Sequence, residues 1–296
     1  MGTHKLANKT EMIGYNSNIS CELSHSGRPL MKTVSIIVAY SPSRENLLQR
    51  FLESLESVPS KGEITIELLT SSEGSRSECL NNLAKKATGD VLLFFDDDVE
   101  LRHNTIDELL KPFYSGEFKN VGIVGGVNIR LKNATKSEIR ADALLSSSLT
   151  MFKSRARYTP IGDTRLTDES EILTCNMAIL RKAFEEVGGF PLDIVPCEEN
   201  VLTNRIVARG YSIVYTPFAV VYHRRPKLFK EYARTVFNYG KGRGIMMRYR
   251  EGNPKLFYKP SWDWLAIAAG VIVHYVSYAS GVIYGYFRKP KKAKTA

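Results

Sequence analysis

The sequence predicts an α/β fold built on a mostly parallel central sheet with flanking helices. The apolar runs at residues 34–38 and 91–95 and the alternating stretch at residues 64–68 have the length and composition of strands. Amphipathic segments with apolar side chains every three or four positions follow these runs. Such alternation of strand and helix favours parallel strands joined by right-handed crossovers. With 296 residues and 43% hydrophobic content, the chain can bury a substantial core.

The helices of the first half have recognisable starts and stops. Ser41 is expected to cap a helix that has Pro42 at its first position and that Pro59 ends. Ser75 and Glu78 have the spacing of a capping box, which opens the next helix. The elements expected here are helices at residues 42–58, 75–87 and 104–113, and a fourth strand at residues 121–127.

Regular patterning fades between residues 131 and 171, where we expect a long functional loop or lid. Periodic segments then return. They predict a strand at residues 175–180, a short helix closed by Gly188 and Gly189, a helix from residue 198 to 210, strands at residues 212–215 and 219–222, and a basic helix at residues 227–249.

The two ends of the chain differ from the expected domain at residues 33–250. Residues 1–32 are polar without periodicity and are assigned to an N-terminal extension. Residues 251–296 form a C-terminal segment with a basic tail. Within it, residues 264–287 carry no acidic or strongly basic side chain, and ~20 residues suffice to cross a bilayer. We expect a membrane-associated helix there, either spanning the bilayer or lying in its interface.

The charge distribution and the cysteine spacing exclude several classes of protein. The net charge is +10, and much of the excess lies between Arg224 and Lys294. No zinc pattern or aromatic RNA-binding signature accompanies it, so an anionic membrane surface is favoured over nucleic acid. The four cysteines lack paired spacing, which argues against a disulfide framework or a zinc site and for a reducing compartment. We therefore expect a membrane-associated protein with its main domain in the cytoplasm.

Three consecutive carboxylates follow the apolar run at residues 91–95. Asp96, Asp97 and Asp98 would lie at the carboxyl end of a parallel strand, where open sheets bind ligands. Oxygen ligands of this kind suit Mg²⁺ or Mn²⁺. A solvated acidic turn is the alternative interpretation. The triplet indicates a metal and diphosphate site.

Two further groups have a structural and a functional interpretation. Glu198 and Glu199 open a predicted helix, where acids are stabilised by the helix dipole, but they could also act as a general base. His223 ends a predicted strand, either as a hydrogen-bonded turn residue or as a metal ligand.

Several motifs in the same order resemble family 2 glycosyltransferases of the GT-A fold, over residues 34–249. One is the stretch 87–98, which ends in the acidic triplet and is similar to the DxD region of that family. The others are Val-Gly-Gly-Phe at residues 187–190, the Glu198–Glu199 pair, Arg205, Gly210 with Tyr211, and the stretch 217–223 that ends at His223. The family's QxxRW motif is missing, so a processive polysaccharide synthase is not expected.

The resemblance implies a role for particular residues. Asp96 and Asp97 would contact the nucleotide-sugar, Asp98 and His223 would hold Mn²⁺ or Mg²⁺, and Glu199, with Glu198 as second choice, would be the catalytic base. Ala39, Tyr40, Glu73 and Asn81 would help bind the nucleotide. Two positions depart from the family pattern, with Ser72 in place of an acid and Leu80 in place of an arginine.

The function implied is inverting transfer of a sugar from a nucleotide-diphosphate donor to a hydroxyl of a glycan or lipid-linked acceptor in the cell envelope. Two alternatives remain open at this point. One is a polyprenyl-phosphate sugar synthase, and the other is a catalytically silent protein that binds sugar nucleotides.

Overall fold

The computed structural model describes residues 10–14, 33–58, 64–248 and 269–288. Its centre is a nine-stranded sheet in the order β1-β3-β2-β4-β8-β6-β9-β5, with β7 paired to β9. The strands are β1 (Thr10–Gly14), β2 (Thr33–Ala39), β3 (Thr65–Ser71), β4 (Val91–Asp96), β5 (Val99–Leu101), β6 (Val121–Arg130), β7 (Arg165–Thr167), β8 (Asn176–Leu180) and β9 (Ser212–His223).

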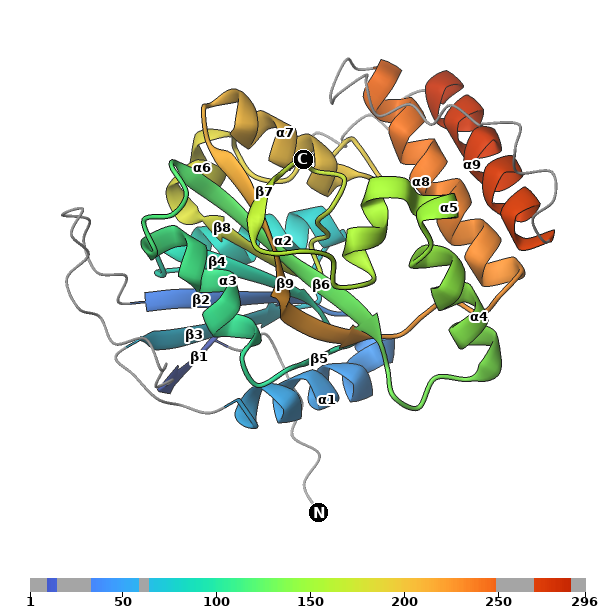
Figure 1. Ribbon diagram of the computed structural model, residues 1–296. Helices are drawn as coiled ribbons and strands as arrows, with labels where there is room; N and C mark the ends of the chain where they lie inside the picture. The colour runs from blue at the N-terminus through green and yellow to red at the C-terminus, as the bar shows by residue number, and fades with distance from the viewer. Residues whose placement is uncertain (1–9, 15–32, 59–63, 249–268, 289–296) are drawn as a thin grey trace.

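Helices cover both faces of the sheet, and a pair of them, α8 and α9, lies side by side beyond it (Figure 1). The helices are α1 (Glu45–Glu56), α2 (Arg76–Lys86), α3 (Thr105–Tyr114), α4 (Lys136–Leu145), α5 (Ser148–Met151), α6 (Arg181–Glu186), α7 (Glu198–Ala208), α8 (Lys230–Arg248) and α9 (Ala269–Phe287), with 3-10 turns η1 (Pro42–Arg44) and η2 (Phe152–Arg157).

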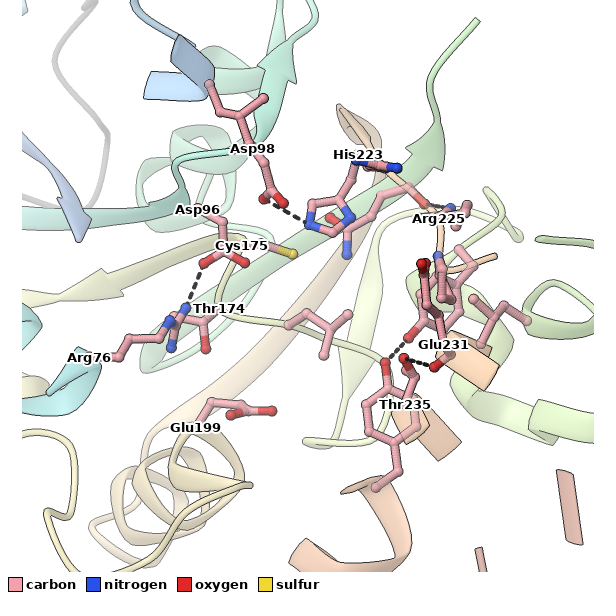
Figure 2. A pocket seen from close by; sticks show the side chains of 18 of the residues that line it. Arg76, Asp96, Asp98, Thr174, Cys175, Glu199, His223, Arg225, Glu231 and Thr235 are labelled. Carbon is pink, nitrogen blue, oxygen red and sulfur yellow. Dashed lines mark hydrogen bonds and ion pairs between the residues drawn. The ribbon is translucent and has the colours of Figure 1, made fainter. Parts of the chain in front are cut away.

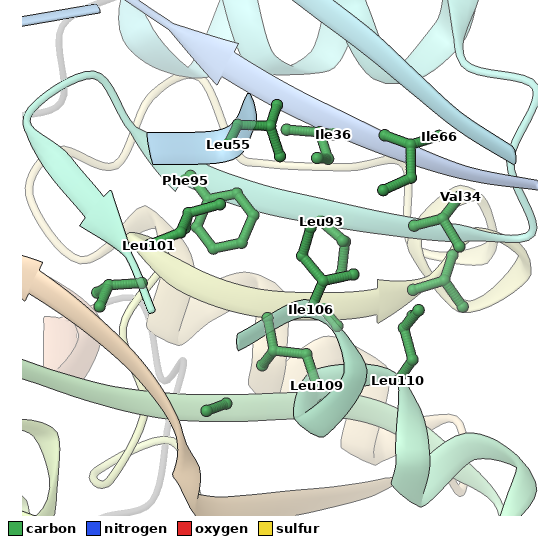
Figure 3. Close-up of a cluster of buried hydrophobic side chains, with 14 of the residues drawn as sticks. Val34, Ile36, Leu55, Ile66, Leu93, Phe95, Leu101, Ile106, Leu109 and Leu110 are labelled. Atoms are coloured by element: carbon green, nitrogen blue, oxygen red, sulfur yellow. The ribbon is translucent and has the colours of Figure 1, made fainter. Parts of the chain in front are cut away.

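Alternation along the central strands divides the core in two. Val34 and Ile36 of β2 face a cluster completed by α1 and α3, as Figure 3 shows, whereas Ile37 faces α2, α6 and α7. Successive side chains of a strand point to opposite faces, so a strand buried on both sides is continuously apolar. This explains why the predicted strands at residues 34–38 and 91–95 are found where expected.

The prediction of a mostly parallel sheet is wrong, because the sheet is mixed. Of the pairings between described strands, three are parallel (β2 with β3, β2 with β4, β6 with β9) and the other five are antiparallel. Strand β8 lies between β4 and β6 and runs antiparallel to both. Local alternation of strand and helix cannot reveal a strand that enters the sheet from later in the chain.

Four local predictions also need correction. Residues 131–171 are not a structureless lid but contain α4, α5, η2 and β7, and Thr135 and Glu138 form a capping box at α4. The assigned N-terminal extension contains β1, which pairs with β3. The two strands predicted at residues 212–215 and 219–222 are one strand, β9, with a register irregularity against β6 between them. Ser41 bonds Ser43 and does not cap η1 with its side chain.

The C-terminal helix is found over residues 269–287, and the rest of the predicted segment, residues 264–268, lies outside the described residues. None of the described helices combines the length and the apolar character needed to cross a bilayer. The expectation of a spanning helix is therefore not supported. Helix α9 instead packs closely against α8.

Candidate active site

A cavity of about 670 Å³ opens at the carboxyl end of β4. Its wall combines the acidic strand end, the first turns of α2 and α7, the end of β9 and one face of α8, as Figure 2 shows. Residues that are more than a hundred positions apart in the sequence therefore line one cavity. The polar side chains that line it include Arg44, Arg76, Asp96, Asp98, Cys175, Glu198, Glu199, His223 and Tyr239.

The acidic triplet divides between two surroundings. Asp96 and Asp98 line the cavity, whereas Asp97 is buried and does not. Asp97 pairs with the Arg44 guanidinium at 2.6 Å and accepts a hydrogen bond from the Ser41 backbone N–H at 3.3 Å. Burial raises the pKa of Asp97, although Arg44 opposes that effect. Asp97 therefore holds the start of η1 in place and does not face the cavity where a nucleotide-sugar would bind.

Asp98 and His223 form a hydrogen-bonded pair. The Asp98 Oδ1 to His223 Nε2 distance is 3.1 Å, because β5 runs antiparallel to β9 with Val99 opposite His223. Burial opposes the charged form of Asp98, but the bond and charge of His223, with Arg44 at 2.6 Å, lower the pKa of Asp98 to about 2. Burial likewise lowers the pKa of His223, and Asp98 outweighs this and raises it.

A divalent cation fits this corner of the cavity. Single ligand atoms of Asp96, Cys175 and His223 all lie within 4.8 Å of one another, and Asp98 bonds the same imidazole. Carboxylates and imidazole are suitable ligands for Mn²⁺. The Cys175 thiol is a soft ligand, whereas Mn²⁺ and Mg²⁺ prefer carboxylate oxygens, and Mn²⁺ also accepts imidazole. The donor set that fits is therefore Asp96, Asp98 and His223.

Arg76 connects the two acidic groups of the cavity. Its guanidinium lies 2.6 Å from an Asp96 oxygen and 3.5 Å from a Glu198 oxygen. Burial would lower the pKa of Arg76, but Asp96, Glu198 and Glu199 raise it, so the side chain is charged. The capping box at Ser75 starts α2 just after β3, which puts the first helical residue at the carboxyl edge of the sheet.

Glu198 and Glu199 occupy the first turn of α7 and differ in environment. Glu198 is buried, and burial together with the neighbouring charge of Glu199 raises its pKa from 4.5 to about 7. Glu199 is half-buried, lines the cavity, and makes no hydrogen bond or ion pair with another residue in the described part of the chain. The two carboxylates therefore differ in that Glu198 pairs with Arg76, whereas Glu199 lines the cavity without a protein partner in the described chain.

The raised pKa of Glu198 predicts a specific dependence of stability on pH. A folded state with the higher acid pKa binds more protons between pH 4.5 and 7, so wild type loses stability as pH rises through that window. At 1.36 kcal/mol for each pKa unit, the loss relative to Glu198→Gln approaches ~3 kcal/mol. Urea unfolding of both proteins at pH 5 and pH 8 measures it. If the difference in free energy of unfolding between wild type and Glu198→Gln is the same at both pH values, the pKa of Glu198 is not raised in the folded protein.

The residues expected at the nucleotide lie near the carboxyl edge of the sheet but do not line the cavity. Ala39 stands beside Asp96 in register, and the Tyr40 N–H donates to Ser71 at the end of β3, just before Glu73. Asn81 is used differently. Its amide accepts from the Phe190 N–H at 2.8 Å and donates to the Phe190 carbonyl at 2.9 Å. Asn81 therefore ties α2 to the loop after Gly189, which leaves its amide groups bonded within the protein.

Several cavity residues were not predicted from the sequence, and four of them make side-chain bonds that shape the wall. Arg44 and Arg76 balance the carboxylates, and Tyr239 of α8 bonds Tyr158 of the region assigned to a loop. Arg225 pairs with Asp142 of α4 at 2.6 Å. A capping box located Arg76 at a helix start, so its position was within reach of prediction, but its partners depend on the sheet order.

Comparison with known proteins now assigns the family. A family model described as "Glycosyltransferase like family 2" matches residues 23–238, which is more than half of the chain. The chain belongs to glycosyltransferase family 2. The predicted resemblance is confirmed, and the cavity at the end of β4 is the candidate active site of a family 2 glycosyltransferase.

Two curated relatives of this family 2 glycosyltransferase match part of it. The O-antigen chain rhamnosyltransferase RfbN of Salmonella typhimurium is 25% identical over 158 residues, covering 53% of this chain and 48% of its own. The O-antigen chain rhamnosyltransferase WbaN of Salmonella anatum is 26% identical over 151 residues, covering 51% and 45%. The matches thus span about half the length of each relative.

Solved structures with a similar backbone are more distant. The mannosyltransferase PcManGT from Pyrobaculum calidifontis, in complex with GDP-Man and Mn²⁺, has a TM-score of 0.49 and 17% identity over 82% of this chain and 73% of its own. S. aureus TarS 1–349 in complex with UDP-GlcNAc has a TM-score of 0.45 and 11% identity over 71% and 64%.

Proposed function

We propose that this family 2 glycosyltransferase moves a sugar from a nucleotide-diphosphate donor to a hydroxyl group by single displacement with inversion. The observation that carries the proposal is that Glu199, free of protein partners in the described chain, opens to the same cavity as Asp96, Asp98 and His223. Glu199 would supply the base. Asp96, Asp98 and His223 could hold a cation that binds the diphosphate.

Glu199 would act on the acceptor. Its carboxylate accepts the proton of the acceptor hydroxyl as that oxygen bonds to the anomeric carbon. The bond from the anomeric carbon to the diphosphate oxygen breaks, and the electron pair leaves with the nucleotide diphosphate. General-base help of this kind contributes roughly 100- to 10,000-fold. Glu198 is buried and pairs with the Arg76 guanidinium, so it supports the position of Arg76 more than it serves as base.

The opposite side of the cavity would receive the donor. A divalent cation held by Asp96, Asp98 and His223 would offset the charge that develops on the leaving diphosphate. Arg44 and Arg76 form ion pairs with these carboxylates and limit the repulsion between them. Mn²⁺ or Mg²⁺ is the proposed cofactor, which the oxygen-rich donor set supports.

The relatives guide the choice of donor and acceptor. Both curated relatives are named O-antigen chain rhamnosyltransferases, so we propose a rhamnose-type nucleotide sugar and a growing, lipid-linked envelope glycan as the first substrates to test.

Membrane association belongs to the same proposal. Helix α9 exposes Val276, Ile283 and Phe287 at 60%, 60% and 73%. Arg288 follows directly, and the chain carries a net charge of +10. An apolar helix face beside basic residues suits the interface of an anionic bilayer. We propose that the catalytic domain works at the cytoplasmic surface of a membrane.

The test is release of nucleotide diphosphate from a panel of nucleotide sugars with Mn²⁺, in the presence of a lipid-linked glycan. We expect turnover with one donor, a product stable to mild acid, and loss of turnover with a chelator. A product labile to mild acid would instead indicate transfer onto a lipid phosphate. Donor binding without any turnover would indicate a silent binding protein.

A further inference from the structure

Helix α8 is packed between α9 and the start of the helix that carries Glu198 and Glu199. Its glycines make the approach possible on both sides. Gly240 and Gly244 lie against backbone atoms of Tyr278 and Val282 of α9, and Gly242 lies against Cys197. At about 100° per residue, Gly242 points roughly opposite to Gly240 and Gly244. One face of α8 therefore meets α9, and the other meets the N-terminus of α7.

The contact at Gly242 has no spare room. A Cβ at Gly242 would lie 2.8 Å from Cys197 Cβ and 3.0 Å from the Pro196 carbonyl oxygen, and it would overlap Cys197 Sγ. Ordinary contact begins at 3.4 Å, so the two segments would have to separate by at least 0.6 Å (3.4 minus 2.8 Å). Cys197 is the residue directly before Glu198, and its φ of 82° fixes the turn into α7.

Other contacts hold the same junction. Val201 of α7 shares a hydrophobic cluster with Ile245 and Met246 of α8. The Asn200 amide donates to the Glu169 carbonyl at 3.3 Å, and the Glu169 carboxylate pairs with Arg243 of α8 at 3.6 Å. The backbone at Glu198 and Glu199 therefore cannot move without displacing contacts made by α8.

We propose that Gly242 is a positioning residue for the reaction: its missing side chain lets α8 set the depth of the first turn of α7, and so the reach of Glu199 into the cavity. This inference rests on the proposed role of Glu199 as base. Gly242 touches neither substrate nor cation and acts only through Cys197. The C-terminal helices then form part of the scaffold of the active site.

Gly242→Ala tests the proposal. Because a misplacement of 1 Å can cost roughly 100-fold, we expect kcat to fall at least ~10-fold, with the Kd for nucleotide diphosphate and Mn²⁺ within about 2-fold of wild type. Alanine is a better helix former than glycine, so helix propensity cannot explain a loss. Unchanged kcat in a folded Gly242→Ala protein would overturn the proposal.

A double variant that moves the missing side chain from position 242 to position 197 distinguishes a positioning role of Gly242 from a general loss of structure. In a Cys197→Gly background, where glycine suits the positive φ and the overlapping side chain is gone, Gly242→Ala should lower kcat less than ~3-fold. An equal loss in both backgrounds would overturn the proposal. If Gly242→Ala does not fold, Cys197→Asn enlarges the same contact from the other side, tolerates the left-handed backbone, and should cause the same drop.

Gly281→Ala is the matched control. Its Cβ would overlap the Phe237 carbonyl oxygen and lie 2.6 Å from the Lys241 backbone nitrogen, so it clashes with the backbone of α8 at least as strongly but makes no contact with Cys197. We expect lower thermal stability with little change in kcat. A loss of kcat equal to that of Gly242→Ala would contradict a specific role for the Cys197 contact.

The variant Glu199→Gln separates this inference from the proposed function. If Glu199→Gln retains full activity, the proposed function itself is contradicted. If Glu199→Gln is inactive while Gly242→Ala is fully active, only the positioning inference fails.

Discussion

Glu199→Gln is expected to lower kcat by roughly 100- to 10,000-fold, the range that general-base catalysis contributes. Glutamine keeps the shape of the side chain but cannot accept the proton of the acceptor hydroxyl. Donor affinity should stay near wild type, because Glu199 makes no bond to Asp96, Asp98 or His223. Steady-state kinetics with the donor found in the panel, together with nucleotide binding, measure both quantities.

Two variants frame that result. Glu198→Gln should lose much less activity than Glu199→Gln, because Glu198 is buried and paired with Arg76. Glu185→Gln changes an exposed glutamate of α6 that faces Arg181, outside the cavity, and should leave kcat unchanged. If Glu198→Gln is the more damaging substitution, the assignment of base within the pair is reversed.

Asp98→Ala has the second large effect. The variant removes the partner of both His223 and Arg44, and one proposed ligand of the cation. A bound cation stabilises the charge of the transition state by several kcal/mol, so we expect Asp98→Ala to lower activity at least ~100-fold. The affinity for Mn²⁺, measured by titrating the protein in the absence of substrate, should also decrease.

Glu100→Ala is the control for that variant. It removes an acid of β5, two positions after Asp98, but Glu100 pairs with Arg50 and does not line the cavity. Its Mn²⁺ affinity and activity should match wild type. Full activity of Asp98→Ala in the presence of Mn²⁺, or equal effects of the two substitutions, would contradict the proposed cation site.

Features with a local cause could be predicted from the sequence. The strand at residues 91–95 is apolar because both of its faces are buried, and the carboxylates at its end mark the edge where ligands bind. The capping box of Ser75 and Glu78 is found as predicted. The equivalent box at Thr135 and Glu138 carried the same signal, but the polar character of residues 131–171 hid the helices there.

Features that depend on distant parts of the chain could not be predicted. The place of β8 between β4 and β6 follows from pairings across some fifty to ninety positions, and no local pattern encodes it. The same holds for Arg76, which meets Glu198 only because the sheet order brings α2 and α7 to one edge. No local pattern shows that α8 meets its neighbours through glycines 240, 242 and 244, because their contacts with α9 and Cys197 depend on the tertiary structure.

The stereochemistry of the product tests the central claim most directly. A single displacement driven by one carboxylate, with the diphosphate leaving from the opposite face, must invert the anomeric centre. We predict that NMR of the product formed by wild-type protein shows the anomeric configuration opposite to that of the donor. A product that retains the configuration of the donor would require a second displacement, and would contradict the assignment of Glu199 as a base that acts on the acceptor.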